Sequence, residues 1–275
     1  MHADLERPLE LTKHEGAGND FLVLADSERR IGIDAEMVRA VCDRHRGVGA
    51  DGLIRLGGSR EGADVSMELW NADGSVAEMS GNGIRCLVQA AVDVQMASPP
   101  TVTVATAAGV KTVCYRPAQA WAAVDMGVVR LGGERTDLPD AARARAVDAG
   151  NPHVVVWSPT LPSDPAVAGV GARLDAETPG GTNVEFIAPG EAPGELLLRV
   201  WERGVGETLA CGTGSCAAAA AARAWGLVGD RVRVCNPGGV LEVTLGAGPL
   251  DPVVLGGPVH RVARVLLDPK LLDAN

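Results

Sequence analysis

Short apolar stretches bounded by turn residues recur along the whole chain and predict a protein rich in β-strands. Most are rich in Val and other β-branched residues and are too short to form helices. The predicted strands are residues 10–12, 21–25, 65–69, 102–105, 110–114, 122–125, 153–157, 184–188, 196–200, 231–234, 240–243, 253–255 and 262–267. Antiparallel sheet is the usual arrangement for strands of this kind, so we expect it here.

One segment of the chain is repeated. Residues 70–83 align without gaps on residues 201–214, at an offset of 131 positions. A predicted strand precedes each copy, and a predicted helix follows each, at residues 84–95 and 215–225. The second helix contains a run of alanines, which have high helix propensity and small side chains that suit a tightly packed interior.

The repeat predicts two related α/β domains. In each domain we expect a mainly antiparallel sheet or open barrel around a central helix. The boundary is placed so that the first domain comprises residues 1–127 and the second comprises residues 128–261. The strand-like C-terminal segment, residues 262–275, is expected to join the first domain.

Composition narrows the classes of function. The chain has 275 residues, 46% of them hydrophobic and only 3% aromatic, with a net charge of -10. Nucleic acids and anionic membranes require basic surfaces, so neither is expected as a partner. The sequence has no long apolar run and no basic signal-peptide start. We therefore expect a soluble cytoplasmic protein that acts on a small molecule.

The cysteines do not indicate a disulfide framework or a structural metal site. They are Cys42, Cys86, Cys114, Cys211, Cys216 and Cys235. No secretory signal accompanies them, and none form the paired Cys-x-x-Cys spacing of zinc sites. Most are expected to be small buried residues. Cys211 is the exception because of its place in the repeat.

The repeat places Ser80 and Cys211 at equivalent positions, each just before a Gly-x-Gly loop that opens a helix. The first turn of a helix binds carboxylates, and it can lower the pKa of a thiol from about 8.5 toward neutrality. Two such helix ends acting on one carboxylate would place a base on each side of its α-carbon, as inversion of configuration requires. A single cysteine before Gly-x-Gly is usually only buried, but the duplication favours catalysis. Neither loop has the Gly-Lys-Ser/Thr ending of a phosphate-binding loop.

The chain resembles the diaminopimelate epimerase family over nearly its full length. The matching motifs, in order, are residues 13–21 (KHEGAGNDF), 44–52 (RHRGVGADG), 71–86, 150–153 (GNPH), 182–186 (TNVEF) and 202–216. The family interconverts LL- and meso-diaminopimelate, for lysine and peptidoglycan synthesis, without pyridoxal phosphate or a metal. The resemblance therefore implies no cofactor, a diaminopimelate substrate, two mirror-related α/β domains and a homodimer.

The resemblance also implies roles for particular residues. Cys211 and the residue at position 80 would be the acid/base pair, and His153 and Glu202 would tune them. Substrate contacts would come from Asn19, Asn71, Gly81, Asn82, Asn151, Asn183, Glu202, Arg203, Gly212 and Thr213. Arg203 has the planar fork that grips a distal carboxylate with two hydrogen bonds. For His153 and Glu202 alone, a purely structural role is the simpler interpretation, and the motif context raises the functional one.

The chain departs from the family at two positions. Gly52 replaces a glutamine that many members have, and Ser80 aligns with the first catalytic cysteine. Three hypotheses account for Ser80. It could replace a native cysteine and impair epimerisation; the chain could be a relative that uses Cys211 alone for α-proton abstraction and β-elimination; or it could be a non-catalytic amino-acid-binding protein. The unneeded thiol of Cys211 counts against the third hypothesis.

Overall fold

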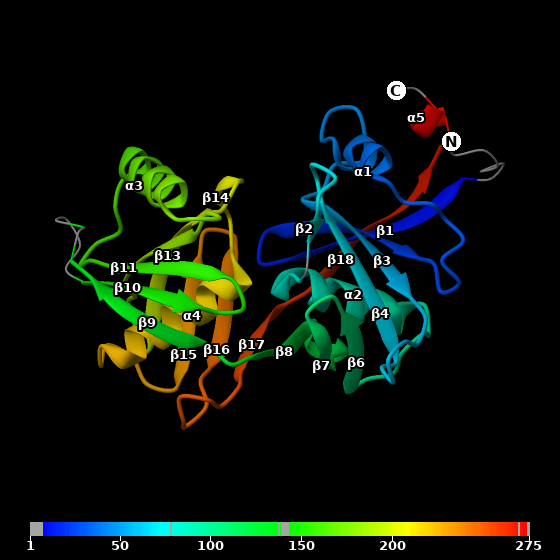
Figure 1. Cartoon of the computed structure of the whole chain (residues 1–275). Helices are drawn as coiled ribbons and strands as arrows, with labels where there is room; N and C mark the ends of the chain where they lie inside the picture. Colours follow the sequence, from blue (N-terminus) through cyan, green and yellow to red (C-terminus); the bar gives the residue numbers. More distant parts are fainter. Residues whose placement is uncertain (1–7, 78, 137, 139–142, 269, 274–275) are drawn as a thin grey trace. The chain divides into compact units, whose positions relative to one another are not determined.

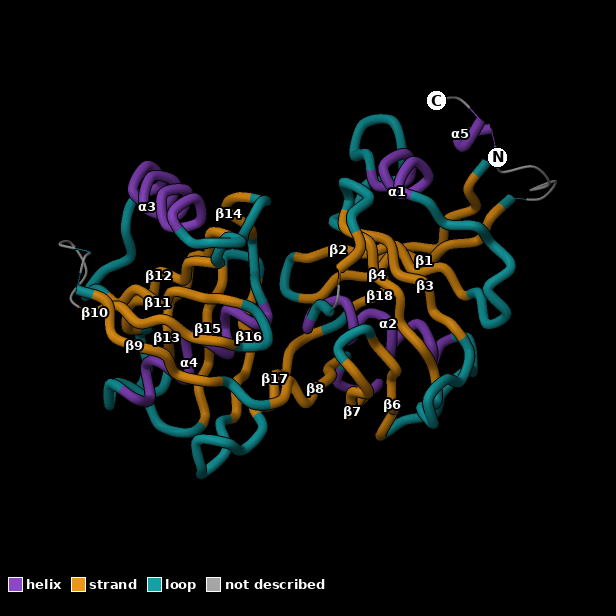
Figure 2. Tube along the Cα trace, in the orientation of Figure 1, coloured by secondary structure: helices purple, strands orange, loops and turns teal. Residues whose placement is uncertain are grey.

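The computed structural model describes residues 8–77, 79–136, 138, 143–268 and 270–273. The chain divides into two compact units (Figure 1). The first unit contains the residues up to Val124 and those from Pro258 onward, and the second is the continuous segment Asp125–Gly257. Strands predominate in both units (Figure 2).

The first unit is a mixed sheet with a central helix. Its strands are β1 (Leu9–Gly16), β2 (Asn19–Ala25), β3 (Gly52–Gly57), β4 (Val65–Asn71), β5 (Val76–Ala77), β6 (Thr101–Thr106), β7 (Gly109–Arg116), β8 (Trp121–Gly127, continuing into the second unit) and β18 (His260–Leu267). Its helices are α1 (Ala35–Cys42), α2 (Gly81–Asp93), the short 3-10 helix η1 (Pro117–Gln119) and α5 (Lys270–Asp273). The strand order is β18-β1-β2-β3-β4-β6-β7-β8, with β5 beside the end of β4.

The second unit repeats this plan. Its strands are β9 (Arg130–Arg135), β10 (Arg143–Asp148), β11 (Pro152–Trp157), β12 (Asn183–Pro189), β13 (Glu195–Glu202), β14 (Gly206–Thr208), β15 (Arg231–Asn236), β16 (Gly239–Thr244) and β17 (Val253–Pro258, ending in the first unit). Its helices are α3 (Asp164–Glu177) and α4 (Gly212–Ala224). The strand order β9-β10-β11-β12-β13-β15-β16-β17 matches that of the first unit strand for strand. The predicted pair of related α/β folds, each around a central helix, is confirmed.

The expected mainly antiparallel pairing is confirmed, with four parallel pairs among the neighbouring strands. Most neighbouring strands are antiparallel, but β2–β3, β4–β6, β11–β12 and β13–β15 are parallel. Parallel neighbours need a long crossover connection. Here α1 connects β2 to β3, and α3 connects β11 to β12. The helices α2 and α4 lie in the connections from β4 to β6 and from β13 to β15.

Each unit is built in three layers. In the first, α2 packs against β1, β2, β3, β4, β7 and β18; in the second, α4 packs against β10, β11, β12, β13, β15 and β16. Nearly all residues of both helices are buried, as expected for a helix enclosed by a sheet. The outer faces of the sheets are covered by α1 and α3, through Met37 and Val41 in α1 and Val167 and Leu174 in α3. Alternating strand residues therefore face either the outer helix or the central helix.

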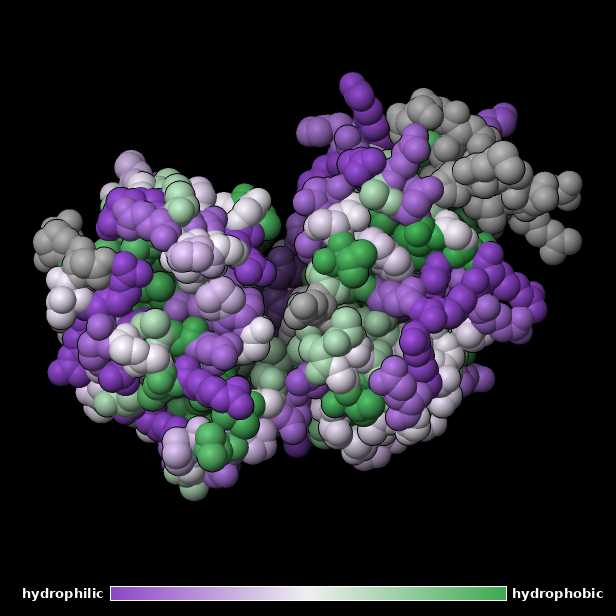
Figure 3. Space-filling view, in the orientation of Figure 1, coloured by the Kyte–Doolittle hydropathy of each residue, from purple (hydrophilic) through white to green (hydrophobic). Residues whose placement is uncertain are grey.

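The surface is mainly hydrophilic, with scattered hydrophobic side chains in the view of Figure 3. None of the helices that the structure describes is long and apolar enough to cross a membrane.

Candidate active site

Ser80 caps the N-terminus of α2. Its backbone is extended (φ -136°, ψ 124°), and its hydroxyl oxygen accepts a hydrogen bond from the backbone N–H of Gly83 at 3.0 Å. Serine is one of the preferred residues at this position because it satisfies one of the unpaired N–H groups of the first helical turn. Gly81 and Asn82 form the rest of that turn and are buried. The hydroxyl oxygen of Ser80 therefore serves as the N-cap of α2.

Two predicted substrate contacts of the first unit, Asn19 and Asn82, are joined in a chain of hydrogen bonds. Arg85 donates to Oδ1 of Asn82 (3.0 Å), Nδ2 of Asn82 donates to Oδ1 of Asn19 (2.5 Å), and Nδ2 of Asn19 donates to Asp51 (3.1 Å). A guanidinium can only donate and a carboxylate can only accept, so both amide orientations are fixed from the two ends of the chain. Each amide nitrogen carries a second N–H, of the kind that suits an anionic ligand.

Asn71 lies at an exposed turn. Its Nδ2 donates to the Ser75 hydroxyl at 3.0 Å, and its carbonyl accepts from the N–H of Gly74. In the sheet it is the partner of Gly52. A Cβ at Gly52 would lie 2.5 Å from the carbonyl oxygen of Trp70, so this backbone has no room for the glutamine that many family members have there.

Cys211 occupies in α4 the place that Ser80 occupies in α2. Its backbone has the same extended conformation (φ -127°, ψ 120°), and its sulfur accepts from the N–H of Gly214 at 3.4 Å. The hydroxyl of Thr213 lies 3.5 Å from the sulfur. The side chain is only 6% exposed. The repeat is thus a repeat of helix-cap geometry, with an oxygen in one copy and a sulfur in the other.

The expected lowering of the thiol pKa at this helix end is wrong for the free protein. Burial raises the pKa of Cys211 well above its ordinary value, and the nearby carboxylates of Glu202 and Glu185 raise it further. The hydrogen bonds from Thr213 and from the N–H of Gly214 act in the opposite direction but are outweighed. The free protein therefore holds Cys211 as a neutral thiol.

Glu202 is the carboxylate beside that thiol. It is the last residue of β13, and it accepts a hydrogen bond from the Thr208 hydroxyl of β14. Burial raises the pKa of Glu202, and the interactions with Thr208 and Cys211 offset this only in part. A carboxylate with a raised pKa near a thiol is suited to exchange a proton with it.

His153 is held from both sides of its ring. Nδ1 lies 2.7 Å from Oε1 of Glu185 on β12, and Nε2 lies 2.8 Å from Oδ1 of Asn151. The side chains of His153 and Glu185 are fully buried. Sequence reasoning included His153 and Asn151 in the site but missed Glu185. The available signal was a single acidic residue inside the apolar strand of residues 184–188.

Asn183 and Arg203 are also brought together. The backbone N–H of Arg203 donates to Oδ1 of Asn183 at 2.9 Å, and Nδ2 of Asn183 donates to the carbonyl of Pro152 at 3.2 Å. The guanidinium of Arg203 is exposed and donates to the carbonyl of Gly180 at 3.2 Å. One nitrogen of the guanidinium is thus held by a hydrogen bond, and the other N–H groups of this side chain are of a kind suited to a carboxylate.

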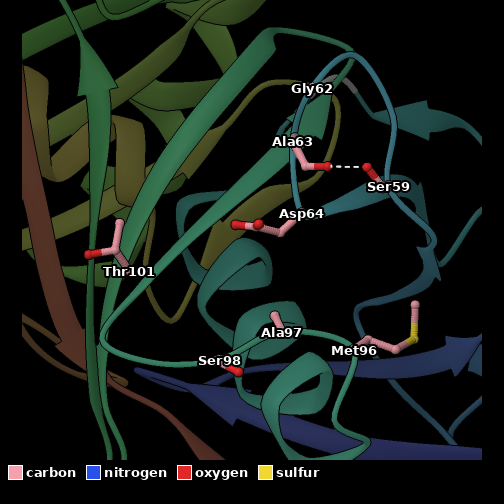
Figure 4. A pocket seen from close by; sticks show the side chains of 8 residues that line it. All are labelled: Ser59, Gly62, Ala63, Asp64, Met96, Ala97, Ser98 and Thr101. Atoms are coloured by element: carbon pink, nitrogen blue, oxygen red, sulfur yellow. Dashed lines mark hydrogen bonds between the residues drawn. The ribbon is translucent and has the colours of Figure 1, made fainter.

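A surface pocket of about 440 Å³ lies elsewhere in the first unit (Figure 4). It is lined by Ser59, Gly62, Ala63, Asp64, Met96, Ala97, Ser98 and Thr101. Residues 96–101 follow the C-terminal end of α2, whereas Ser80 caps its N-terminal end. At 1.5 Å per residue the two ends of this helix are roughly 20 Å apart. The Asp64 carboxylate accepts two hydrogen bonds from Thr103. This pocket is therefore separate from the predicted site.

The predicted residues thus form one group in each unit. Ser80, Gly81, Asn82 and Asn19 lie around the start of α2 in the first unit. In the second, Cys211, Gly212, Thr213 and Glu202 lie around the start of α4, His153 and Asn151 form one hydrogen-bonded pair, and Asn183 and Arg203 form another. Asn71 lies at its own turn, where its side chain is hydrogen-bonded to Ser75.

Solved structures of racemases and epimerases share this fold. A hydroxyproline epimerase from Agrobacterium vitis superposes with a TM-score of 0.71 at 17% identity, covering 98% of this chain and 95% of that one. A predicted epimerase from Pseudomonas aeruginosa has a TM-score of 0.72 at 16% identity, covering 94% and 99%. At such identities the likeness concerns the fold alone.

Sequence comparisons are more specific. The family model described as diaminopimelate epimerase matches residues 11–132 and 145–261. The diaminopimelate epimerase of Prochlorococcus marinus (strain MIT 9313) is 37% identical, over 97% of this chain and 95% of its own length. That of Corynebacterium glutamicum (strain R) is 40% identical, over 85% and 90%. The chain therefore belongs to the diaminopimelate epimerase family.

Proposed function

We propose that this chain acts on diaminopimelate by moving a proton at its α-carbon, with Cys211 as a catalytic acid/base and without pyridoxal phosphate. The observation that carries the proposal is the placement of the Cys211 thiol at the start of α4, with the half-buried carboxylate of Glu202 nearby. The two named relatives are diaminopimelate epimerases, and this chain matches them over most of their length, which supports this choice of substrate.

The proposed reaction begins with the thiol proton. Glu202 accepts it, and the resulting Cys211 thiolate removes the α-proton of the substrate. The substrate carboxylate rests on the N–H groups of Gly212 and Thr213, where the positive end of the helix stabilises the charge that develops next to the α-carbon. Arg203 and Asn183 hold the distal end. Return of a proton to the opposite face of the α-carbon completes epimerisation.

The group at position 80 limits that last step. A thiol there would be a pKa-matched acid, whereas a serine hydroxyl ionises far less readily. We therefore propose that the chain exchanges the α-proton on the Cys211 side and epimerises slowly.

The serine at position 80 also supports a second candidate function, because a hydroxyl is a much weaker acid than a thiol. With Cys211 alone as the base, the carbanion formed at the α-carbon could expel a leaving group from the β-carbon. Such a reaction is a β-elimination and needs only one thiolate. It would require a substrate that carries a β-substituent, which diaminopimelate lacks.

Incubation with LL-diaminopimelate in D₂O tests the proposal. The chain and a Ser80→Cys variant are compared by NMR for α-deuterium and by chiral chromatography for the meso product. We expect deuterium with mostly retained configuration from the chain, and epimerisation about 10²–10⁴-fold faster from the variant. Equal and rapid epimerisation by both proteins would show that no thiol is needed at position 80.

A pair of cysteine variants identifies the catalytic thiol. Cys211→Ser should abolish exchange, because it removes the base. Cys235→Ser, which changes a partly buried cysteine on β15, should leave the exchange rate unchanged. Exchange that survives in Cys211→Ser would contradict the assignment of the base.

We also propose that the protein works as a cytoplasmic homodimer, on the strength of its family resemblance. Sedimentation equilibrium of the purified protein at micromolar concentration tests the assembly, and a monomer mass would contradict it.

A further inference from the structure

The two units carry different side chains at one equivalent pair of buried positions. Glu185 on β12 pairs with Val200 and lies beside Val155, and Ile54 on β3 pairs with Leu69 and lies beside Val23. These are the same positions of the repeated sheet, 131 residues apart.

The neighbouring strand shows the same difference. His153 lies beside Asn183 at the start of the β11–β12 pair, and Phe21 lies beside Gly52 at the start of the β2–β3 pair. The second unit thus buries His153 and Glu185 where the first buries an aromatic and an aliphatic side chain. An apolar pair satisfies this fold in the first unit, so packing alone does not require a charge there.

The carboxylate of Glu185 lies against the first turn of α4. A Cβ on Gly214 would be 2.6 Å from Oε1 of Glu185. In the first unit, a Cβ on Gly83 would be 3.3 Å from Cδ1 of Ile54. The carboxylate therefore occupies the space beside the helix end capped by Cys211, in the place where the other helix end has a methyl group.

Glu185 carries a cost for folding. Its side chain is fully buried, and Oε2 has no hydrogen-bond partner among the residues that the structure describes. A buried carboxylate with an unsatisfied oxygen is destabilising, and well-packed apolar residues often replace a buried ion pair without loss of stability. Within the part of the chain that the structure describes, the side chain of Glu185 is hydrogen-bonded only to Nδ1 of His153, and this contact therefore explains the residue.

We propose that Glu185 is a positioning residue for the active site described under Proposed function, on which this inference rests: it accepts the Nδ1–H of His153 and thereby fixes the ring as a second acceptor, beside Glu202, for the proton of the Cys211 thiol. A proton that enters or leaves the imidazole must then do so at Nε2, on the side of Asn151. Carboxylates that hold a catalytic or metal-binding imidazole in one orientation act in this way. Glu185 itself touches no reacting atom.

Two single variants separate orientation from packing. Glu185→Ile installs the first unit's residue and removes the acceptor. Glu185→Gln keeps an oxygen that can accept the Nδ1–H. In the Ser80→Cys background, we expect Glu185→Ile to lower kcat about 10–100-fold with KM changed less than about threefold, and Glu185→Gln to retain most of the activity. Unchanged kcat in Glu185→Ile, or equal losses in both variants, would overturn the proposal.

A double variant tests whether the pair is merely structural. His153→Phe with Glu185→Ile copies both residues of the first unit. We expect it to unfold at the same temperature as the parent or higher, while its exchange activity is lost. A clear fall in unfolding temperature would assign the pair to folding and overturn the proposal.

The ring itself gives a readout that does not depend on activity. Nitrogen-15 NMR of His153 should show a protonated Nδ1 in the parent and in Glu185→Gln, and a change of tautomer in Glu185→Ile. The same tautomer in all three proteins would overturn the inference even if the parent is active. A parent with the expected tautomer but no activity on diaminopimelate, with or without Ser80→Cys, would overturn the proposed function instead.

Discussion

At the scale of single residues, the first turns of α2 and α4 differ in how closely neighbouring side chains approach a glycine of the turn. A Cβ on Gly214 would meet Oε1 of Glu185 at 2.6 Å, whereas a Cβ on Gly83 would meet Cβ of Ser80 at 3.1 Å and Cδ1 of Ile54 at 3.3 Å. Both glycines are helical, where alanine is intrinsically preferred by about 1 kcal/mol. The crowding around each glycine therefore decides whether its replacement by alanine raises or lowers the stability of the protein.

We expect Gly214→Ala to destabilise the protein by about 1–3 kcal/mol, because the buried Glu185 carboxylate cannot move away freely. Gly83→Ala is the matched control and should change stability by less than about 1 kcal/mol, because an isoleucine methyl can shift by a few tenths of an ångström. Urea unfolding of both variants measures the difference. Equal effects would mean that Glu185 does not hold its position against the helix.

The site could be predicted from the sequence only in part. The gapless repeat placed Ser80 and Cys211 at equivalent positions before a helix, but the helices begin three residues earlier than expected, at Gly81 and Gly212, so that the two residues are helix caps. The direction of the pKa shift of Cys211 could not be predicted in this way, because it depends on burial and on the carboxylates of Glu202 and Glu185, the second of which is brought near by strand pairing. Glu185 itself was hidden in an apolar strand, where one acidic residue does not reveal its partner.

At the scale of elements, an ionic cluster ties β1 and β2 to the loop after α1. Asp20 on β2 accepts two hydrogen bonds from Arg44, at 3.0 and 2.6 Å, and lies 2.8 Å from Nζ of Lys13 on β1. Burial alone would raise the pKa of Asp20, but Arg44 and Lys13 outweigh it and lower the pKa to about 2. The folded protein therefore favours the charged carboxylate.

The stability from this cluster should depend on pH in the acid range. A carboxyl group with a lowered pKa in the folded state stabilises it fully above the unfolded pKa of about 4, and the effect is lost as pH falls toward 2. The contribution is about 2 kcal/mol. We expect the parent to lose that much more unfolding free energy than Asp20→Asn between pH 5 and pH 2, as measured by urea titration. Parallel losses in the two proteins would contradict the assignment.

Among the elements, most apolar strands and the two central helices were predictable, whereas the covering helices were not. The fully buried β3 was missed, because an arginine and two terminal glycines interrupt its short apolar stretch. α1 is short, and α3 is rich in alanine and glycine with only a few buried positions. β9 and β10 were also missed, because most of their residues are exposed or only partly buried. The parallel pairs β2–β3 and β11–β12 depend on these unpredicted covering helices, whereas the pairs β4–β6 and β13–β15 cross over through the predicted central helices α2 and α4.

At the scale of the whole molecule, the two units differ in continuity. The sequence placed the domain boundary between residues 127 and 128 and returned residues 262–275 to the first domain. In the structure the compact units divide after Val124 and after Gly257. The first unit is closed by β18, which pairs with β1 from Leu9↔Leu267 to Glu15↔His260.

This difference predicts the behaviour of fragments. We expect residues 125–257 to fold alone, because their strands pair with one another around α4. Residues 1–124 should not fold, because β1 would lose β18, and Gln89 and Ala120 would lose their hydrogen bonds to the backbone of Val259. The folding of each fragment is measured by the dispersion of its amide signals in NMR spectra and by the cooperativity of its thermal unfolding. A well-folded fragment of residues 1–124 would contradict the expectation.

The pairing of β1 with β18 also sets an order of events on the ribosome. Domains usually fold as they emerge, the N-terminal one first. Here the first unit must wait for its last strand while the whole second unit is translated, on the order of 10 s at bacterial rates. During that interval the edge of β1 is an open template for other nascent strands. Synthesis from a slowed ribosome, or in cells depleted of holding chaperones, should therefore lower the yield of this protein through its first unit.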